Sequence, residues 1–185
     1  LGLLKDGQAE RLAAAGVTRF NHNLESSRAH FGEICHTHGY DERIATVRAA
    51  KAAGLEACCG GILGMGESLE DRVQLALELR ELEVESIPVN FLDPRPGTPL
   101  GDQPRLRPQD CLRALAMFRF VNPSRDIRVA GGREVNLRHL QPLALFPANS
   151  LFSNGYLTTP GQGAEADRRM IVDLGFRVAE LVAAE

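Results

Sequence analysis

The stretch RAAKAAGLEACCGG, residues 48–61, joins a helix to a strand in a pattern that recurs along the chain. Its alanine-rich turns suit a helix, and Gly54 stands where a glycine in the left-handed conformation commonly ends one. The short apolar run after Gly54 is typical of a buried strand. The stretch RLAAAGVTRFNHN, residues 11–23, repeats this design with Gly16 in the same role. We therefore predict two successive helix-to-strand units.

The alternation continues towards the C-terminus. Ser68 and Asp71 form a capping-box pattern, which predicts a helix that begins at Ser68. An apolar stripe of leucines at helical spacing follows it. The remaining predicted elements are a strand in SIPVNFL (86–92), a Pro-rich loop (93–108), a helix (109–121), a strand in DIRVAGG (126–132), a helix (137–145), a short strand in NSLF (149–152) and an amphipathic helix (165–182).

Strands that alternate with helices predict a parallel sheet with covered faces. The notable residues at the strand ends, Asn23, Cys58, Asn90 and Arg128, follow one another at spacings of 35, 32 and 38 residues. Eight such units make a barrel of about 250 residues. We therefore predict an α/β chain that forms the second half of a (β/α)8 barrel, about the last four strand–helix units, over residues 1–145, with a C-terminal extension over 146–185. A doubly wound open sheet is the alternative, which spacing alone leaves open.

Composition narrows the functional class. The net charge of −3 gives no basis for a nucleic-acid or acidic-membrane partner. No apolar run approaches the roughly 20 residues of a membrane span. The four cysteines fit neither a zinc pattern nor a secreted disulfide framework, so we expect a reducing cytoplasm. The chain begins at Leu1 inside a predicted structural unit, and we expect it to be a fragment.

Polar residues gather at the end of the first predicted strand. In FNHNLES, residues 20–26, Asn21, Asn23 and Glu25 share one face because alternate residues of a strand point the same way. Two amides and a carboxylate side by side suit a polar ligand such as a ribose or a urea-like ring. The alternative is a strand end whose polar groups only satisfy nearby backbone.

The second strand end carries adjacent cysteines. Cys58 and Cys59 must point to opposite faces, so at most one faces the barrel interior. A cysteine in a strand also serves as a small buried hydrophobe, which is the alternative to a ligand role. The glycines that follow let the backbone approach a ligand closely, and Ile62 offers an apolar contact for a flat ring.

Arg128 is expected to point into the mouth of the barrel from the fourth predicted strand. Its nearest acidic neighbour in the sequence is Asp126, two residues earlier. The alternative to a functional role is therefore an ordinary ion pair between Arg128 and Asp126.

These stretches together resemble a known family. GGILGMGE, residues 60–67, matches the G-x-I-x-G-x-x-E pattern of radical S-adenosylmethionine enzymes. Five stretches in order closely resemble the biotin synthase family: FNHNLES, CCGGILGMGESLEDR (58–72), SIPVNFLDPRPGTPL (86–100), IRVAGGRE (127–134) and NSLFSNGYLTTPG (149–161). The resemblance implies a radical-dependent sulfurtransferase that converts dethiobiotin to biotin. It also implies S-adenosylmethionine, a 4Fe-4S cluster that reduces it, and a 2Fe-2S cluster that supplies the sulfur.

By the same resemblance, Cys58 would be a thiolate ligand of the 2Fe-2S cluster and Arg128 its fourth ligand, while Cys59 would face outwards. The CxxxCxxC motif that binds the 4Fe-4S cluster is absent from the 185 residues, and the other ligands of the 2Fe-2S cluster are expected upstream. The fragment alone is therefore expected to be inactive.

The resemblance also assigns the cofactor and substrate contacts. Asn23 and Glu25 would hold the ribose of S-adenosylmethionine, Arg43 its methionyl carboxylate, and Ile62 its adenine. For dethiobiotin, Asn21, Asn23 and Asn90 would bind the ureido ring, and Thr158 and Thr159 the carboxylate.

The implied partners are an electron donor such as flavodoxin or ferredoxin, and a second subunit in a homodimer. Two alternatives stay open from the sequence. One is another radical S-adenosylmethionine barrel enzyme, of the hydrogenase-maturation or pyrrolysine-pathway type. The other is a non-catalytic half-barrel scaffold.

Overall fold

A parallel sheet forms the centre of the computed structural model, which describes residues 2–156 and 159–179. Its strand order is β1-β2-β4-β5-β6, and β3 continues the line of β2 along β4. The bounds are β1 Arg19–Asn21, β2 Glu56–Cys58, β3 Gly61–Leu63, β4 Ser86–Phe91, β5 Asp126–Val129 and β6 Ser150–Leu151. A separate antiparallel hairpin pairs β7 (Gly155–Tyr156) with β8 (Thr159–Pro160).

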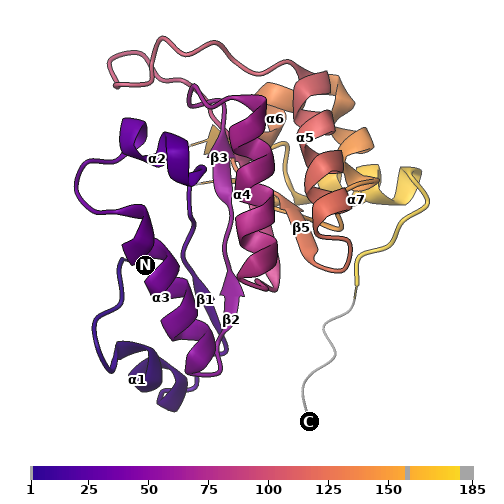
Figure 1. The fold of residues 1–185 in the computed structure, drawn as a ribbon. Helices are drawn as coiled ribbons and strands as arrows, with labels where there is room; N and C mark the ends of the chain where they lie inside the picture. Colours follow the sequence, from indigo (N-terminus) through magenta and orange to yellow (C-terminus); the bar gives the residue numbers. More distant parts are fainter. Residues whose placement is uncertain (1, 157–158, 180–185) are drawn as a thin grey trace.

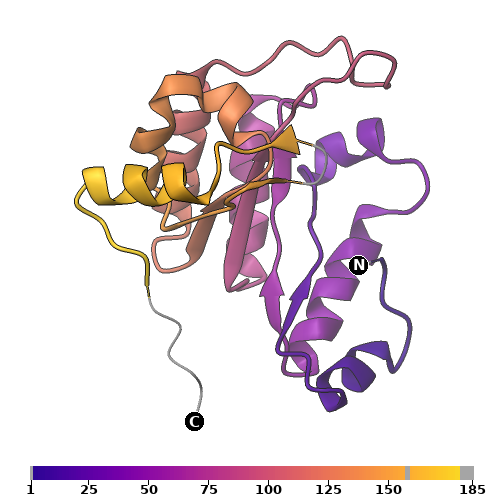
Figure 2. The ribbon, with the colours of Figure 1, turned by 180° about the vertical axis from the view of Figure 1, so that it is seen from behind.

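Helices alternate with the strands and pack beside one another along the sheet (Figure 1). Their bounds are α1 Gln8–Ala14, α2 Arg28–Ile34, α3 Tyr40–Ala52, α4 Leu69–Glu81, α5 Pro108–Val121, α6 Arg133–Leu137, the 3-10 helix η1 Arg138–Leu145 and α7 Ala164–Asp173. Seen from behind, the strands lie in front of α4 and α5, with the β7–β8 hairpin close to one end of the sheet (Figure 2). This arrangement leaves the sheet face opposite α4 and α5 as the inner wall of a part-barrel.

Local signals in the sequence set several helix ends. Gly16 and Gly54 follow α1 and α3 with φ angles of 85° and 83°, the left-handed conformation that glycine adopts at low cost. Ser68 caps α4, and its side chain accepts a hydrogen bond from the Asp71 backbone while Asp71 bonds back to the Ser68 backbone. These features confirm the predicted ends of the helices.

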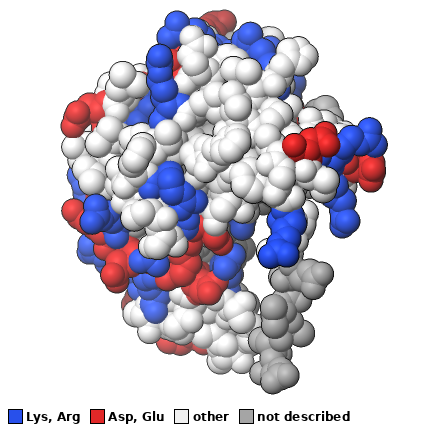
Figure 3. Space-filling view, turned by 90° about the vertical axis from the view of Figure 1, so that its right-hand side faces the viewer, with Lys and Arg blue, Asp and Glu red and all other residues white. Residues whose placement is uncertain are grey.

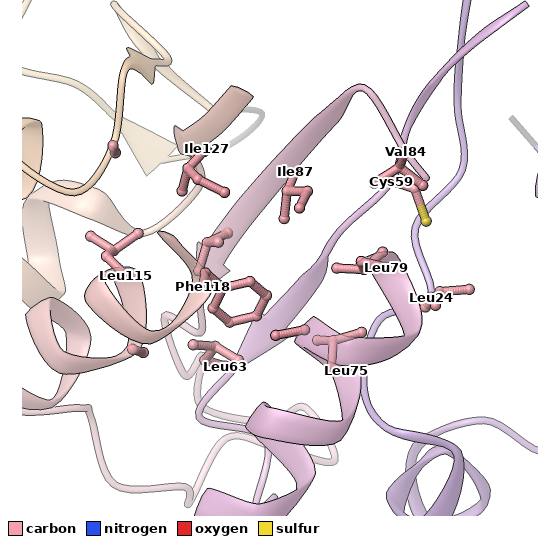
Figure 4. Packing of buried hydrophobic residues seen from close by; sticks show 14 of the residues in the cluster. Leu24, Cys59, Leu63, Leu75, Leu79, Val84, Ile87, Leu115, Phe118 and Ile127 are labelled. Atoms are coloured by element: carbon pink, nitrogen blue, oxygen red, sulfur yellow. The ribbon is translucent and has the colours of Figure 1, made fainter. Parts of the chain in front are cut away.

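The main hydrophobic core lies between the sheet and its helices (Figure 4). Leu75 and Leu79 of α4 and Phe118 of α5 are at most 1% exposed and meet Ile87 of β4 and Ile127 of β5. All six residues of β4 are buried, as expected for a central strand of a parallel sheet. Cys59 is fully buried in the same cluster.

Pro88 interrupts the pairing of the central strand on its β2–β3 side, while on the other side it pairs with Arg128 of β5. β2 pairs with β4 at Ser86 and β3 pairs with it again from Val89, so the ladder skips the proline, which has no backbone N–H to donate. Gly60 lies in this gap, where an added Cβ would stand 1.9 Å from the Pro88 carbonyl oxygen. The predicted single strand after Gly54 therefore consists of two short strands, β2 and β3.

Two predicted helices differ from the structure. The segment predicted as one helix over 137–145 is the end of α6 followed by 3-10 turns, because Pro142 cannot donate the backbone bond of an α-helix. The predicted helix over 165–182 is wrong at residues 174–179, because Gly175 takes a φ of 77° and ends α7, and residues 180–182 lie outside the described residues. Among the described residues, no helix has the length and apolar character needed to cross a bilayer.

Candidate functional site

The parallel strands bring the predicted polar residues to neighbouring positions on one sheet. Asn21 of β1 pairs in register with Cys58 of β2, and Ile62 of β3 pairs with Asn90 of β4. Arg128 of β5 stands opposite Pro88. Side chains from β1, from the aligned strands β2 and β3, from β4 and from β5 therefore converge on the inner face of the sheet, although the residues are far apart in sequence.

Cys58 lies at the centre of this group. Its thiol is free of any disulfide and the residue is 6% exposed. The Asn21 amide nitrogen Nδ2 lies 3.3 Å from the Cys58 sulfur, and Nη1 of Arg128 lies 4.0 Å from it. Cys59 instead points into the helix-covered core, where burial raises the pKa of its thiol far above the ordinary range. The two adjacent cysteines thus occupy opposite faces, as strand alternation predicts.

Arg128 is held by residues other than Asp126, the acidic residue that was its alternative partner in the sequence. Its Nε donates to the Ser150 hydroxyl at 2.8 Å, and its guanidinium lies 5.5 Å from the centre of the Phe152 ring. Asp126 accepts a hydrogen bond from the Asn149 amide. Within the described part of the chain Arg128 and Asp126 form no ion pair, so Arg128 is available to a ligand beside Cys58.

A second polar group lies beyond the end of β1. Arg43 reaches over from α3, and its Nη1 donates to the Asn23 carbonyl at 2.6 Å and lies 3.8 Å from a Glu25 carboxylate oxygen. The Asn23 side chain accepts from the Gly60 backbone N–H at 3.1 Å. Because Pro88 offers no N–H at this level of β4, the Gly60 backbone turns to β1 instead, and its carbonyl accepts from Leu24 and Glu25. The strand break thereby fixes the segment that carries Asn23 and Glu25.

Two atoms of this group are buried without a partner in the described chain: Oε2 of Glu25 and Nε of Arg43. Burial raises the pKa of the Glu25 carboxyl, and this effect outweighs the lowering by Arg43 and by a hydrogen bond with Asn23. Buried polar atoms are normally hydrogen-bonded, so an unpaired acceptor and an unpaired donor in one group are candidates for contacts with a ligand. A molecule that carries both a hydroxyl and a carboxylate would satisfy them.

The Asn90 side chain already bonds to the protein backbone, whereas a residue that only contacts a ligand would have its polar atoms free. Its Nδ2 donates to the Gly61 carbonyl at 3.1 Å, and its Oδ1 accepts from the Gly131 N–H at 2.9 Å. An added Cβ at Gly131 would meet both Asn90 Oδ1 and the Tyr156 ring, so the β7–β8 hairpin approaches the site here. Thr159 lies in β8, and Thr158 lies outside the described residues.

No role for Glu67 was predicted from the sequence, although the motif contains it. Its carboxylate accepts from the backbone N–H groups of Gly64 and Met65 and from Arg72 Nε, all within 3.0 Å. Glu67 is 9% exposed and orders the loop that follows Ile62. Ser150 and Phe152 were also missed, although they are alternate residues of the predicted NSLF strand and their shared face was readable.

The chain is similar to known families and proteins along nearly its whole length. The family model for the radical SAM superfamily matches residues 1–79, and that for the Biotin and Thiamin Synthesis associated domain matches residues 88–177. A biotin synthase from Salinibacter ruber is 62% identical over 176 residues, which cover 95% of this chain and 49% of that protein. Those from Rhodopirellula baltica and Bacillus cytotoxicus are 58% and 54% identical, over 96% and 97% of this chain and 50% and 54% of their own lengths.

The chain belongs to the biotin synthase family.

This biotin synthase family member spans about half the length of the relatives that it matches. Among solved structures, methylornithine synthase (PylB) superposes with a TM-score of 0.80 at 18% identity, over 97% of this chain and 57% of that one. The [FeFe]-hydrogenase maturase HydG superposes with a TM-score of 0.76 at 15% identity, over 95% and 43%. At these identities the likeness concerns the fold alone. It confirms the predicted α/β part-barrel, whereas the division at residue 145 stays a prediction.

Proposed function

We propose that this chain is the C-terminal half of a sulfurtransferase that converts dethiobiotin to biotin with S-adenosylmethionine and iron–sulfur clusters. The observation that carries the proposal is the inward Cys58 thiol, which Asn21 and Arg128 flank beside the unpaired atoms of Glu25 and Arg43. When bound, S-adenosylmethionine supplies a deoxyadenosyl radical that abstracts hydrogen, and the 2Fe-2S cluster supplies the sulfur. All of this activity belongs to the full-length protein.

The Asn23–Glu25–Arg43 group fits S-adenosylmethionine. Glu25 Oε2 is a free acceptor for a ribose hydroxyl, with Asn23 beside it, and Arg43 Nε is a free donor for the methionyl carboxylate. Ile62, which pairs with Asn90 across β3 and β4, offers the apolar contact for adenine. Burial raises the pKa of the Glu25 carboxyl, and the neighbouring Arg43 opposes this effect by favouring the ionised form.

Cys58 fits an iron ligand because it is a soft donor that faces the interior and has no disulfide partner. Arg128 would complete the site from β5, with Ser150 holding its guanidinium in place. The remaining ligands of the 2Fe-2S cluster, and all ligands of the 4Fe-4S cluster, would come from upstream of this chain.

Dethiobiotin would lie between Asn21, Asn23 and Asn90, with its carboxylate at Thr158 and Thr159. Asn90 keeps one spare lone pair on Oδ1 after bonding to Gly131, so it can still accept from a ureido N–H. We further propose a cytoplasmic homodimer that flavodoxin or ferredoxin reduces. A non-catalytic scaffold gives no reason for buried polar atoms without partners at the C-terminal ends of the strands. These atoms favour the enzyme over the scaffold.

The two adjacent cysteines provide the test. In the full-length protein with its clusters loaded, Cys58→Ala should abolish the visible absorption of the 2Fe-2S cluster and the formation of biotin. Cys59→Ser, on the opposite face, should leave both largely intact and cost only some stability through its buried hydroxyl. Equal loss of the cluster in both variants would reject the assignment.

A further inference from the structure

The Asn21 side chain contacts Cys58 at two atoms. Its Nδ2 lies 3.3 Å from the Cys58 sulfur and 3.1 Å from the Cys58 carbonyl oxygen. An amide nitrogen carries two hydrogens, so both donors of Asn21 are directed at one residue. The contact follows from the register, which places Asn21 opposite Cys58, and the backbone bond from His22 to Cys58 holds that register.

This arrangement differs from a simple substrate contact. With both hydrogens used, Asn21 can offer a ligand only its Oδ1, which has no partner among the described residues. An acceptor at this point suits an N–H group and disfavours a carbonyl. Asn21 would therefore select a ligand group that donates a hydrogen bond over a group that only accepts one.

We propose that Asn21 is a positioning residue for the Cys58 sulfur, and that its N–H···S hydrogen bond raises the reduction potential of the iron–sulfur cluster that Cys58 holds. The inference rests on the proposed function of Cys58. A hydrogen bond to a ligand sulfur withdraws electron density from it, which favours the reduced cluster. The second bond, to the Cys58 carbonyl, fixes the amide so that the donor remains aimed at the sulfur.

Arg128 acts on the same sulfur from the other side, but from a longer distance of 4.0 Å. Asn21 is therefore the closer of the two donors. Its side chain is uncharged, so its effect on the sulfur comes from the hydrogen bond and not from a long-range charge. Replacing Asn21 isolates the hydrogen bond from the general electrostatics of the site.

The test is the reduction potential of the 2Fe-2S cluster in the full-length, reconstituted protein. Asn21→Leu keeps a similar volume and removes the donor. A hydrogen bond that favours the reduced cluster by about 1 kcal/mol predicts, on its removal, a reduction equilibrium about fivefold less favourable, a downward shift of about 40 mV for one electron. The Fe–S(Cys) stretching frequencies should shift in the resonance Raman spectrum. Asn21→Gln, which retains the amide, should recover part of both changes.

The exposed Gln74 of α4 provides the matched control, because its amide bonds only to Glu70 on the same helix. Gln74→Leu should leave the potential and the Raman spectrum unchanged. A loaded Asn21→Leu protein with the wild-type potential would overturn the inference. So would loss of the cluster in both Asn21→Leu and Asn21→Gln, because the amide would then have only a structural role. Should Cys58→Ala retain its cluster, the proposed function itself would fail, which is a separate result.

Discussion

Arg128 lies between three different contacts: the Ser150 hydroxyl, the Phe152 ring and the Cys58 sulfur. A guanidinium is normally a cation and a poor metal ligand, so its role needs a direct test. We expect Arg128→Ala in the loaded full-length protein to change the visible spectrum and the reduction behaviour of the 2Fe-2S cluster, with activity reduced but measurable. Arg128→Lys should retain the charge but not the planar geometry. An unchanged spectrum in folded, loaded Arg128→Ala would reject ligation.

The sequence predicted which face of a strand a residue occupies better than it predicted the groups that the residue contacts. Asn21 and Asn23 alternate with the buried Phe20, His22 and Leu24, as strand alternation predicts. Glu25 has a φ of 70°, in the left-handed region, so the shared face of Glu25 stays a prediction. The engagement of Asn90 by Gly61 and Gly131 could not be predicted, because it depends on how three strand ends meet. Likewise, the Ser150 anchor of Arg128 requires the register between β5 and β6, which no local pattern encodes.

At the scale of elements, Asp71 ties two helices together. Its carboxylate accepts from Ser68, the N-cap of α4, and from Ser27, the N-cap of α2. These hydrogen bonds, above all the one from Ser27, lower the pKa of Asp71 from its ordinary value of 3.8 to about 2. The stabilisation is therefore complete above about pH 4 and is lost as the pH falls from there towards 2.

Asp71→Ala should lower the free energy of unfolding of the full-length protein by about 1–2 kcal/mol at pH 7, in the range of lost helix caps. Urea unfolding at a series of pH values would measure this loss. The difference between wild type and variant should shrink between pH 4 and pH 2. Glu70→Gln, one residue earlier on the exposed side of α4, is the control and should change little. A constant difference at all pH values would contradict the role of the ionised carboxylate.

The break between β2 and β3 makes a sharp demand on Gly60. An added methyl would lie 1.9 Å from the Pro88 carbonyl oxygen, a backbone atom that cannot move aside. Gly60→Ala should cost about 3 kcal/mol or more, at the upper end of overpacking penalties, as measured by thermal or urea unfolding. Gly32 of α2 is the matched control, because a methyl there meets nothing within 4 Å. Gly32→Ala should stabilise by up to about 1 kcal/mol. Similar effects of both changes would show that the strands separate easily.

The early end of α7 was readable in the sequence. Gly175 stands after the helix as Gly16 and Gly54 do, with a comparable positive φ. The apolar periodicity of the segment obscured this signal, because Val172 and Phe176 continue a helical stripe. In the structure these two side chains are 67% and 41% exposed. A glycine directly after a helix therefore ends it even where the apolar periodicity continues, when the apolar side chains have no core to pack against.

At the scale of the molecule, the sheet has two open edges. In the described residues β1 pairs only with β2, and β6 only with β5. A cavity of about 740 Å³ beside β6 has apolar lining residues that include Phe146, Ile171 and Phe176. Figure 3 shows the side that carries α5 and α7, where uncharged atoms form much of the surface between charges of both signs. Open edges and apolar surface of this kind favour association.

The 185-residue chain expressed alone should therefore be insoluble or associated, without a sharp thermal transition. The upstream segment of the full-length protein, supplied in trans, should bind it and restore a monodisperse species in size-exclusion chromatography. Phe146→Asp, in the cavity wall, should weaken this rescue. Leu69→Asp, at a residue that is 77% exposed at the start of α4, should not. A monodisperse monomer with a cooperative transition would count against the half-barrel.

The shortness of β6 has a consequence for when the site forms during synthesis. Only two residues, Ser150 and Leu151, offer the edge on which a strand from the upstream half would close the barrel. Such a contact spans most of a full-length chain, so it forms late, after the upstream half has left the ribosome. Ser150 of the same short strand anchors Arg128, so displacement of β6 from β5 would also release the arginine beside Cys58. We expect the arginine to be held most firmly once an upstream strand has closed on β6.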